Sequence, residues 1–182
     1  MAVTSRGTVL MLIGACSSSA GPGTISGAQP TPAVSSDAAL AGDQAMTQLI
    51  RDLVALLSRE VALGDITARL GPVARDPGIP MPAELTPSDP AVRRVEVGRY
   101  PESGKPYTVE LELTVPVSVA ALVSVFGAYR EGRTDRGMPR EIVFPPAGAG
   151  PWKIVIVAQL PPGASPIGDG VTSTVTLRRD PR

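Results

Sequence analysis

The sequence predicts an α+β protein, in which an N-terminal helix and short helices pack on an antiparallel sheet of about five strands. Three patterns carry this prediction. Apolar residues recur at helical spacing between residues 46 and 61, apolar and polar residues alternate over residues 107–115, and residues 152–160 are almost entirely apolar. We expect these elements to form one domain over residues 37–182, because the length of the chain allows one domain plus accessory segments.

Residues 1–15 have the layout of a secretory signal peptide. Arg6 is the only charge, an apolar run covers residues 9–13, and two small residues precede Cys16. The apolar run is much shorter than the about 20 residues that cross a bilayer, so it is not expected to be a membrane span.

The residues Ile13-Gly14-Ala15-Cys16 resemble the lipobox of bacterial lipoproteins. The resemblance implies that the signal is cut before Cys16, that the thiol is lipidated, and that acyl chains anchor the protein to a membrane of the cell envelope. Ser17 then implies the periplasmic face of the outer membrane in a bacterium with two membranes. The alternative is an incidental cysteine at the end of a polar tail.

Residues 16–36 contain almost no large apolar side chain and are expected to form a disordered tether. A long helix over residues 37–63 follows, with a Ser cap before it, Gly64 after it and an apolar stripe made of Met46, Leu49, Ile50, Leu53, Leu56, Leu57 and Val61. We expect the stripe to face the core, although a partner-binding amphipathic helix near the membrane has the same pattern. Asp65 can cap a short helix over residues 65–70.

Residues 72–90 are rich in Pro, Asp and Gly and are expected to form an irregular loop. A hairpin over residues 92–115 follows, with its turn at residues 101–104. A helix over residues 118–126 begins at Ser118 and stops at Gly127. The remaining strands are expected at residues 141–144, 152–160 and 171–178, and the short connections between them favour antiparallel pairing.

The two short helices show weak self-similarity at a period near 56 residues. Aligning Gly71 with Gly127 also aligns other apolar positions, Leu70 with Phe126, Ile66 with Leu122 and Val61 with Val117. A duplication and a chance match of two amphipathic helices both explain this alignment.

A helix ending in an apolar-Gly step ahead of an antiparallel sheet resembles small outer-membrane assembly lipoproteins of the SmpA/BamE type. Residues 65–72 and 118–129 carry this resemblance, and related tandem folds occur in secreted inhibitors of β-lactamase. The resemblance is topological and implies a protein-binding role without catalytic residues.

The composition excludes several function classes. The chain has no histidine and a single cysteine, which removes the usual general base, the commonest zinc ligand and an internal disulfide. Lys and Arg number 17 against 17 Asp and Glu, with no basic run, so nucleic-acid binding is not expected. No phosphate loop or metal-ligand pattern is present, and we expect neither a cofactor nor a metal ion.

These observations favour a lipid-anchored, non-catalytic protein of the cell envelope that binds another envelope protein. The alternative is an envelope module that binds a small ligand or glycan through Arg93, Arg94 and Trp152. A third hypothesis is a carboxylate-dependent hydrolase that uses Glu110 and Glu112, which share one face of a strand; a solvated strand face explains the pair more simply.

Overall fold

The computed structural model describes residues 36–132, 139–162 and 167–181, which belong to one compact unit. The expected signal peptide, Cys16 and the tether up to residue 35 lie outside the described residues. The helices are α1 (Ser36–Leu57), α2 (Leu63–Leu70), α3 (Val119–Phe126) and the 3-10 turn η1 (Ile167–Asp169). The strands are β1 (Val73–Arg75), β2 (Ala83–Leu85), β3 (Val92–Arg99), β4 (Pro106–Ser118), β5 (Arg130–Glu131), β6 (Arg140–Val143), β7 (Trp152–Leu160) and β8 (Val171–Pro181).

The described strands form one antiparallel sheet in the order β1-β2-β3-β4-β8-β7-β6-β5. The prediction of about five strands is therefore wrong, because the sheet has eight. The additional strands β1, β2 and β5 are two or three residues long. β1 and β2 lie in the stretch predicted as an irregular loop, and β5 lies between the predicted helix over residues 118–126 and the predicted strand at residues 141–144. Such short segments carry no measurable period, and they become strands through their neighbours: β2 pairs with β3, β1 pairs with β2, and β5 pairs with β6.

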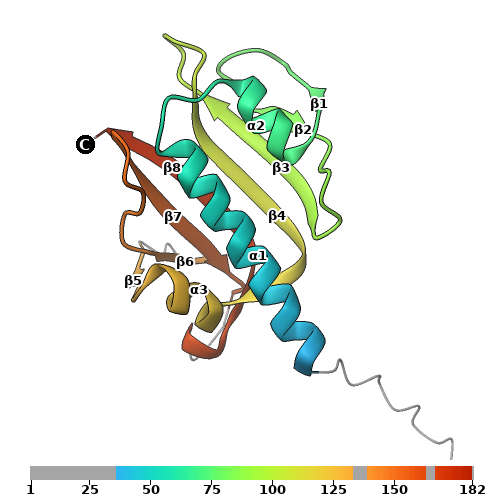
Figure 1. Ribbon diagram of the computed structural model, residues 1–182, viewed down its shortest axis with the longest axis vertical. Coiled ribbons are helices and arrows are strands. Elements are labelled where there is room, and N and C mark those ends of the chain that lie inside the picture. Colours follow the sequence, from blue (N-terminus) through green and yellow to red (C-terminus); the bar gives the residue numbers. More distant parts are fainter. Residues whose placement is uncertain (1–35, 133–138, 163–166, 182) are drawn as a thin grey trace, which may run out of the picture. The chain divides into compact units, whose positions relative to one another are not determined.

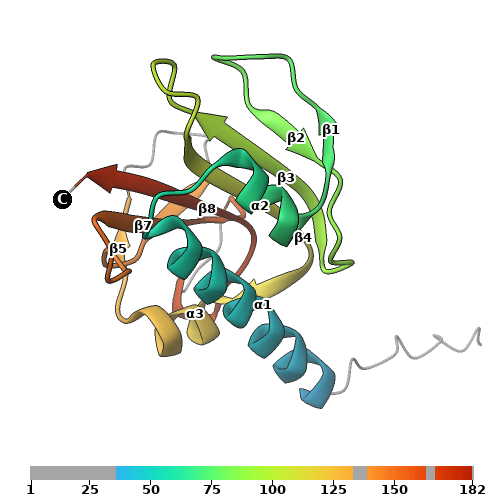
Figure 2. The same ribbon diagram turned by 45° about the horizontal axis from the view of Figure 1, so that its top comes forward.

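The three α-helices cover one face of the sheet, and α1 crosses it diagonally (Figures 1 and 2). The predicted stripe of α1 faces this sheet, with Met46, Leu49, Ile50, Leu53 and Leu57 buried. Inward-facing residues of the central strands complete the core, among them Val109, Leu111, Ile154, Ile156, Val175 and Leu177. Burial of this one face fixes the register of every strand, since a one-residue slip would turn the apolar set outward.

The predicted long helix over residues 37–63 is wrong at its end, because α1 stops at Leu57. The hydroxyl of Ser58 donates to the carbonyl of Val54 at 2.6 Å, and α2 starts six residues after α1 ends, at Leu63. Gly64 therefore lies inside α2 and does not terminate α1. The carboxylate of Asp65 accepts the backbone N–H of Ala62 at 2.8 Å, which satisfies one free donor at the start of α2.

The element order is repeated within the chain. One short helix and four strands, α2 with β1–β4, are followed by a second such set, α3 with β5–β8. In each set the first strand lies at an edge of the sheet and the fourth lies at its centre. Gly71 and Gly127 end the two helices with φ of 122° and 86°, and each N–H donates at 2.9 Å to the carbonyl four residues earlier. This correspondence supports duplication over chance similarity.

Among the described residues, no helix has both the length and the apolar character needed to cross a membrane.

Candidate functional site

The candidate functional site is the face of the sheet that no described helix covers, called here the uncovered face. Strand alternation places every second side chain on this face, and the register aligns those side chains in rows across the sheet. One row comprises Glu84, Glu96, Glu110, Thr176, Val157 and Val143, and the next comprises Arg94, Glu112, Thr174, Gln159 and Glu141. The face is therefore rich in glutamate over β2–β4 and rich in threonine and valine over β8, β7 and β6.

Three carboxylates lie directly opposite one another on β2, β3 and β4, and we call Glu84, Glu96 and Glu110 the glutamate row. Side chains in such positions have Cβ atoms about 5 Å apart, and like charges there destabilise a sheet. Arg94 offsets part of this repulsion, because its guanidinium lies 3.1 Å from Glu84 and also pairs with Glu96.

Glu110 has no such compensation. It forms no ion pair with any residue that the structure describes, and the hydroxyl of Thr176 donates a long hydrogen bond to it at 3.4 Å. The half-buried carboxylate therefore places an unmatched negative charge in the middle of the uncovered face.

The two predicted ligand-binding arginines, Arg93 and Arg94, both contact glutamates of this face. Arg93 pairs with Glu112, and Arg94 bridges two members of the glutamate row. The hydrogen bond to Glu84 and the charge of Glu96 raise the pKa of Arg94 above its ordinary value. Both guanidinium groups are thus engaged by carboxylates of the same chain, which leaves less of their charge for an anionic ligand.

Two hollows mark the uncovered face and its edge. The polar one, of about 220 Å³, spans four strands and is lined by Arg94, Glu96, Glu110, Glu112, Gln159 and Thr174. The apolar one, of about 290 Å³, lies near β6 and is lined mainly by Tyr129, Val143, Pro145, Pro146 and Val155. The polar hollow offers hydrogen-bond acceptors and negative charge, whereas the second offers apolar contact.

Trp152, the third predicted ligand-binding residue, is not close to the arginines. It lies at the start of β7 on the face covered by helices, where the guanidinium carbon of Arg179 stands 4.3 Å from its ring centroid. Arg179 is 1% exposed and donates to the backbone carbonyls of Pro106 at 2.8 Å and Arg59 at 2.9 Å. The structure therefore separates Trp152 from Arg93 and Arg94 and gives its ring an internal cation.

The sequence interpretation missed Arg179. The predicted strand stopped at residue 178, and extending its alternation by one residue would have placed Arg179 on the inner face beside Leu177. A charged residue at an inward position is the signal that could have identified it.

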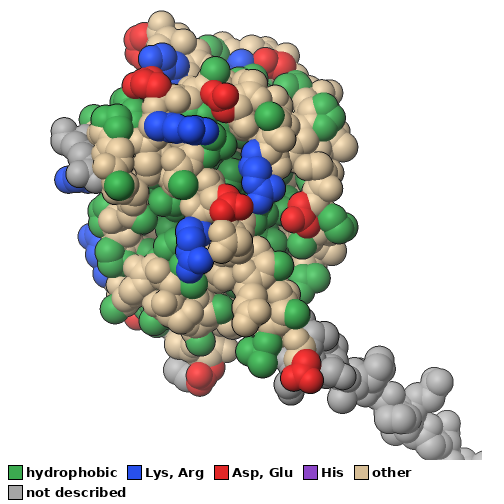
Figure 3. Space-filling model, viewed as in Figure 1, with side chains coloured by type: hydrophobic (Ala, Val, Ile, Leu, Met, Phe, Trp, Pro, Cys, Tyr) green, Lys and Arg blue, Asp and Glu red, His purple; other side chains and the backbone are tan. Residues whose placement is uncertain are grey.

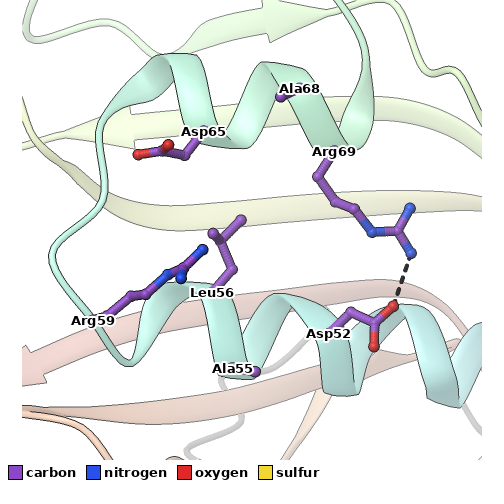
Figure 4. A pocket seen from close by; sticks show the side chains of 7 residues that line it. All are labelled: Asp52, Ala55, Leu56, Arg59, Asp65, Ala68 and Arg69. Carbon is purple, nitrogen blue, oxygen red and sulfur yellow. Dashed lines mark hydrogen bonds and ion pairs between the residues drawn. The ribbon is translucent and has the colours of Figure 1, made fainter.

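A second candidate lies on the helix-covered face, between α1 and α2. This groove, of about 580 Å³, is lined by Asp52, Ala55, Leu56, Arg59, Asp65, Ala68 and Arg69. Arg69 reaches from α2 to Asp52 of α1 at 3.0 Å and ties the two helices together (Figure 4). Arg59 makes no side-chain ion pair with a described residue. On this face, Figure 3 shows basic side chains with hydrophobic side chains between them.

The hydrogen bonds in the groove hold Asp52 in its charged form. The amide of Gln48 donates to Asp52 at 2.7 Å and, together with the hydrogen bond from Arg69, lowers the pKa of this carboxyl. Within the described ranges, no group of three or more His, Cys, Asp or Glu side chains is arranged to hold a metal ion.

No protein-family model matches the chain, and neither a curated protein sequence nor a solved structure is significantly similar to it.

Proposed function

We propose that this chain is a lipid-anchored protein of the cell envelope that binds another envelope protein, without catalysis, through the uncovered face of its sheet. The observation that carries the binding role is the glutamate row. A sheet that served only as a scaffold would gain stability by replacing one of three directly opposed glutamates with a neutral residue. Groups that weaken a fold locally are typical of functional sites.

The composition of the uncovered face supports a protein partner. Beyond the threonines of β8, the same face carries Val157 and Val143, which are half-buried, so polar and apolar groups are available on one surface. Protein interfaces combine the two in this way, with an apolar centre and a polar rim. The lipobox-like residues before Cys16 supply the proposed anchor, which would hold this surface near other envelope proteins.

Photo-crosslinking in the cells that make the protein tests the binding face. A photoreactive residue at Thr176, in the middle of the uncovered face, should crosslink a defined partner. The same residue at Ala45, which is exposed on α1, serves as the control and should not. Equal adducts from both positions, or none from Thr176, would contradict binding through the sheet.

The anchor is tested separately. Cys16→Ser should move the protein from the membrane fraction to the soluble fraction after cell lysis, because the proposed acyl chains would be lost. Retention of the variant in the membrane fraction would refute lipid attachment at this residue and leave the crosslinking result unaffected.

The groove between α1 and α2 favours the alternative function, an envelope module that binds a small ligand. Leu56, Ala55 and Ala68 give it an apolar floor, and Arg59 offers a cation that no described carboxylate engages. If this alternative holds, Arg59→Gln should abolish binding of an anionic ligand while Thr176 gives no crosslink.

A further inference from the structure

We infer that the partner binds the uncovered face through a basic protein segment, whose Lys or Arg side chains contact the glutamate row. This inference rests on the proposed function and names the chemistry of the partner. Its first support is charge: over β2–β4 the uncovered face carries four glutamates, Glu84, Glu96, Glu110 and Glu112, against two arginines, Arg93 and Arg94. The excess over these three strands is two negative charges, and the next cation along the row, Arg75 of β1, lies opposite Glu84 at the edge of the sheet, away from Glu110.

The position of the excess is the second support. Arg94 serves Glu84 and Glu96, and Arg93 serves Glu112, which leaves Glu110 as the carboxylate without a cation in the described part of the chain. Glu110 is also the member of the glutamate row nearest the middle of the sheet, where β4 pairs with β8. A cation supplied from outside would therefore complete a pattern of alternating charge that the chain itself leaves incomplete.

The shape and lining of the polar hollow are the third support. Its volume of about 220 Å³ equals that of about seven liquid waters, which is room for the end of a long side chain. Gln159 and Thr174 line the hollow beside Glu110 and add polar atoms that can accept from an ammonium or guanidinium group. The valines beyond Thr176 can contact the aliphatic stems of such side chains or apolar neighbours on the partner.

The surface also has a source of binding free energy that does not require new buried area. Repulsion within the glutamate row weakens the free protein, and a bound cation removes it. The same glutamates therefore lower the stability of the free protein and raise its affinity for a basic segment.

The test titrates hexalysine, as the probe, into the folded protein. Isothermal titration calorimetry and backbone NMR shifts are the readouts. Hexalysine should bind in low salt, shift resonances of β3, β4 and β8, and lose affinity as salt is added. The double variant Glu96→Gln/Glu110→Gln should weaken binding at least about tenfold, the scale expected for losing a close charge pair. Glu102→Gln, the same charge change on the exposed turn between β3 and β4, should alter affinity less than twofold.

Thermal melting of the same variants guards against a folding defect. Glu110→Gln should raise the Tm of the free protein by about 1–4 °C, because one like charge leaves the row. A lower Tm, or equal loss of hexalysine binding in Glu102→Gln, would overturn the inference. Self-association of the chain through this face, detected by sedimentation, would also overturn it, since the occupant would then be a second copy.

The outcomes separate this inference from the function on which it rests. If hexalysine fails to bind but Thr176 crosslinks a partner, the basic chemistry is refuted and protein binding stands. If Thr176 gives no crosslink, the proposed function fails independently of the peptide result.

Discussion

At the scale of single residues, Arg179 holds three parts of the chain together. Its guanidinium on β8 donates to carbonyls of Pro106, at the start of β4, and Arg59, just beyond α1, and it stacks on Trp152 of β7. Burial lowers the pKa of Arg179 below the ordinary guanidinium value, yet the group remains charged in proteins. The contacts with carbonyls and ring therefore stabilise a buried cation with no carboxylate ion pair among the described residues.

We predict that Arg179→Lys lowers the free energy of unfolding by about 2 kcal/mol, because a single ammonium cannot donate to both carbonyls and stack on the ring. Urea unfolding followed by circular dichroism measures the loss. Arg178→Lys is the matched control: Arg178 is exposed on the other face, where Asp180 accepts from it at 3.0 Å, and the change should cost less than about 0.5 kcal/mol. Equal losses in the two variants would contradict the role given to Arg179.

Carboxylates with lowered pKa predict how stability depends on pH. The hydrogen bond from Gln48 is the main cause at Asp52, and the hydrogen bond from Arg99 is the main cause at Asp76. Because these pKa values are lower in the folded state than in the unfolded state, their contribution is present above about pH 4 and is lost as the pH falls further.

We therefore expect the free energy of unfolding to decrease as the pH falls below about 4. The double variant Asp52→Asn/Asp76→Asn should show a shallower decrease, measured by urea titrations at successive pH values. Unchanged slopes in this variant would show that other groups control the acid sensitivity. High salt should also weaken the effect, since both carboxylates are partly exposed to solvent.

Residue patterns in the sequence anticipated the surface of the site better than its interior. Alternation around residues 107–115 places Glu110 and Glu112 on one wet face, and the structure has them there on β4. The opposition of Glu84, Glu96 and Glu110 was not predictable, because Glu84 lies in a stretch that reads as a loop and its pairing with β3 is non-local. The separation of Trp152 from Arg93 likewise depends on which face each strand turns to the helices.

At the scale of elements, the end of α1 depends on a close approach by the loop after β6. A Cβ atom at Gly150 would lie 1.8 Å from the carbonyl oxygen of Ser58, and one at Gly148 would lie 2.0 Å from the Ser58 hydroxyl. Real side chains do not approach so closely, so these two positions let the loop lie against the residue that follows the last turn of the helix.

We predict that Gly150→Ala destabilises the protein by about 2 kcal/mol, because the loop or the end of α1 must move to admit the methyl group. Gly64→Ala is the control: it lies in α2 with no atom within 4 Å of the new Cβ, and it should gain about 0.5–1 kcal/mol through helix propensity. Thermal or urea unfolding distinguishes the opposite signs. A loss of stability in both variants would contradict the close-approach explanation.

Long elements were predictable and short ones were not. The apolar run of β7 and the stripe of α1 extend over enough residues to show a period or a composition, whereas β1, β2 and β5 do not. The predicted end of α1 was also wrong. Val61 continues the helical spacing of the apolar residues and is buried, but it belongs to the connection between α1 and α2. Spacing alone does not reveal where the backbone leaves the helix.

At the scale of the whole molecule, the two repeated halves share one sheet and one core. The junction is the pairing of β4 with β8, and α1 contacts β4 from one half and β7 from the other. Neither half can expose its strands at this junction without losing buried apolar surface and a ladder of hydrogen bonds. The repeat is thus an architectural pattern within one folding unit.

We predict a single cooperative unfolding transition for this unit. The fluorescence of Trp152, the only tryptophan in the chain, should report the same urea midpoint as far-ultraviolet circular dichroism, which follows the entire backbone. Two separated midpoints would show instead that the halves unfold independently. Glu102→Gln, on an exposed turn, provides a reference variant in which both probes should still coincide.

The ends of the sheet have a consequence for crowded conditions. The outermost strands β1 and β5 are three and two residues long, and Pro72 immediately precedes β1. A neighbouring copy that tried to extend the ladder would find only a few backbone groups to pair with at either border. Many copies at high local concentration would therefore resist polymerising into fibrils through these borders.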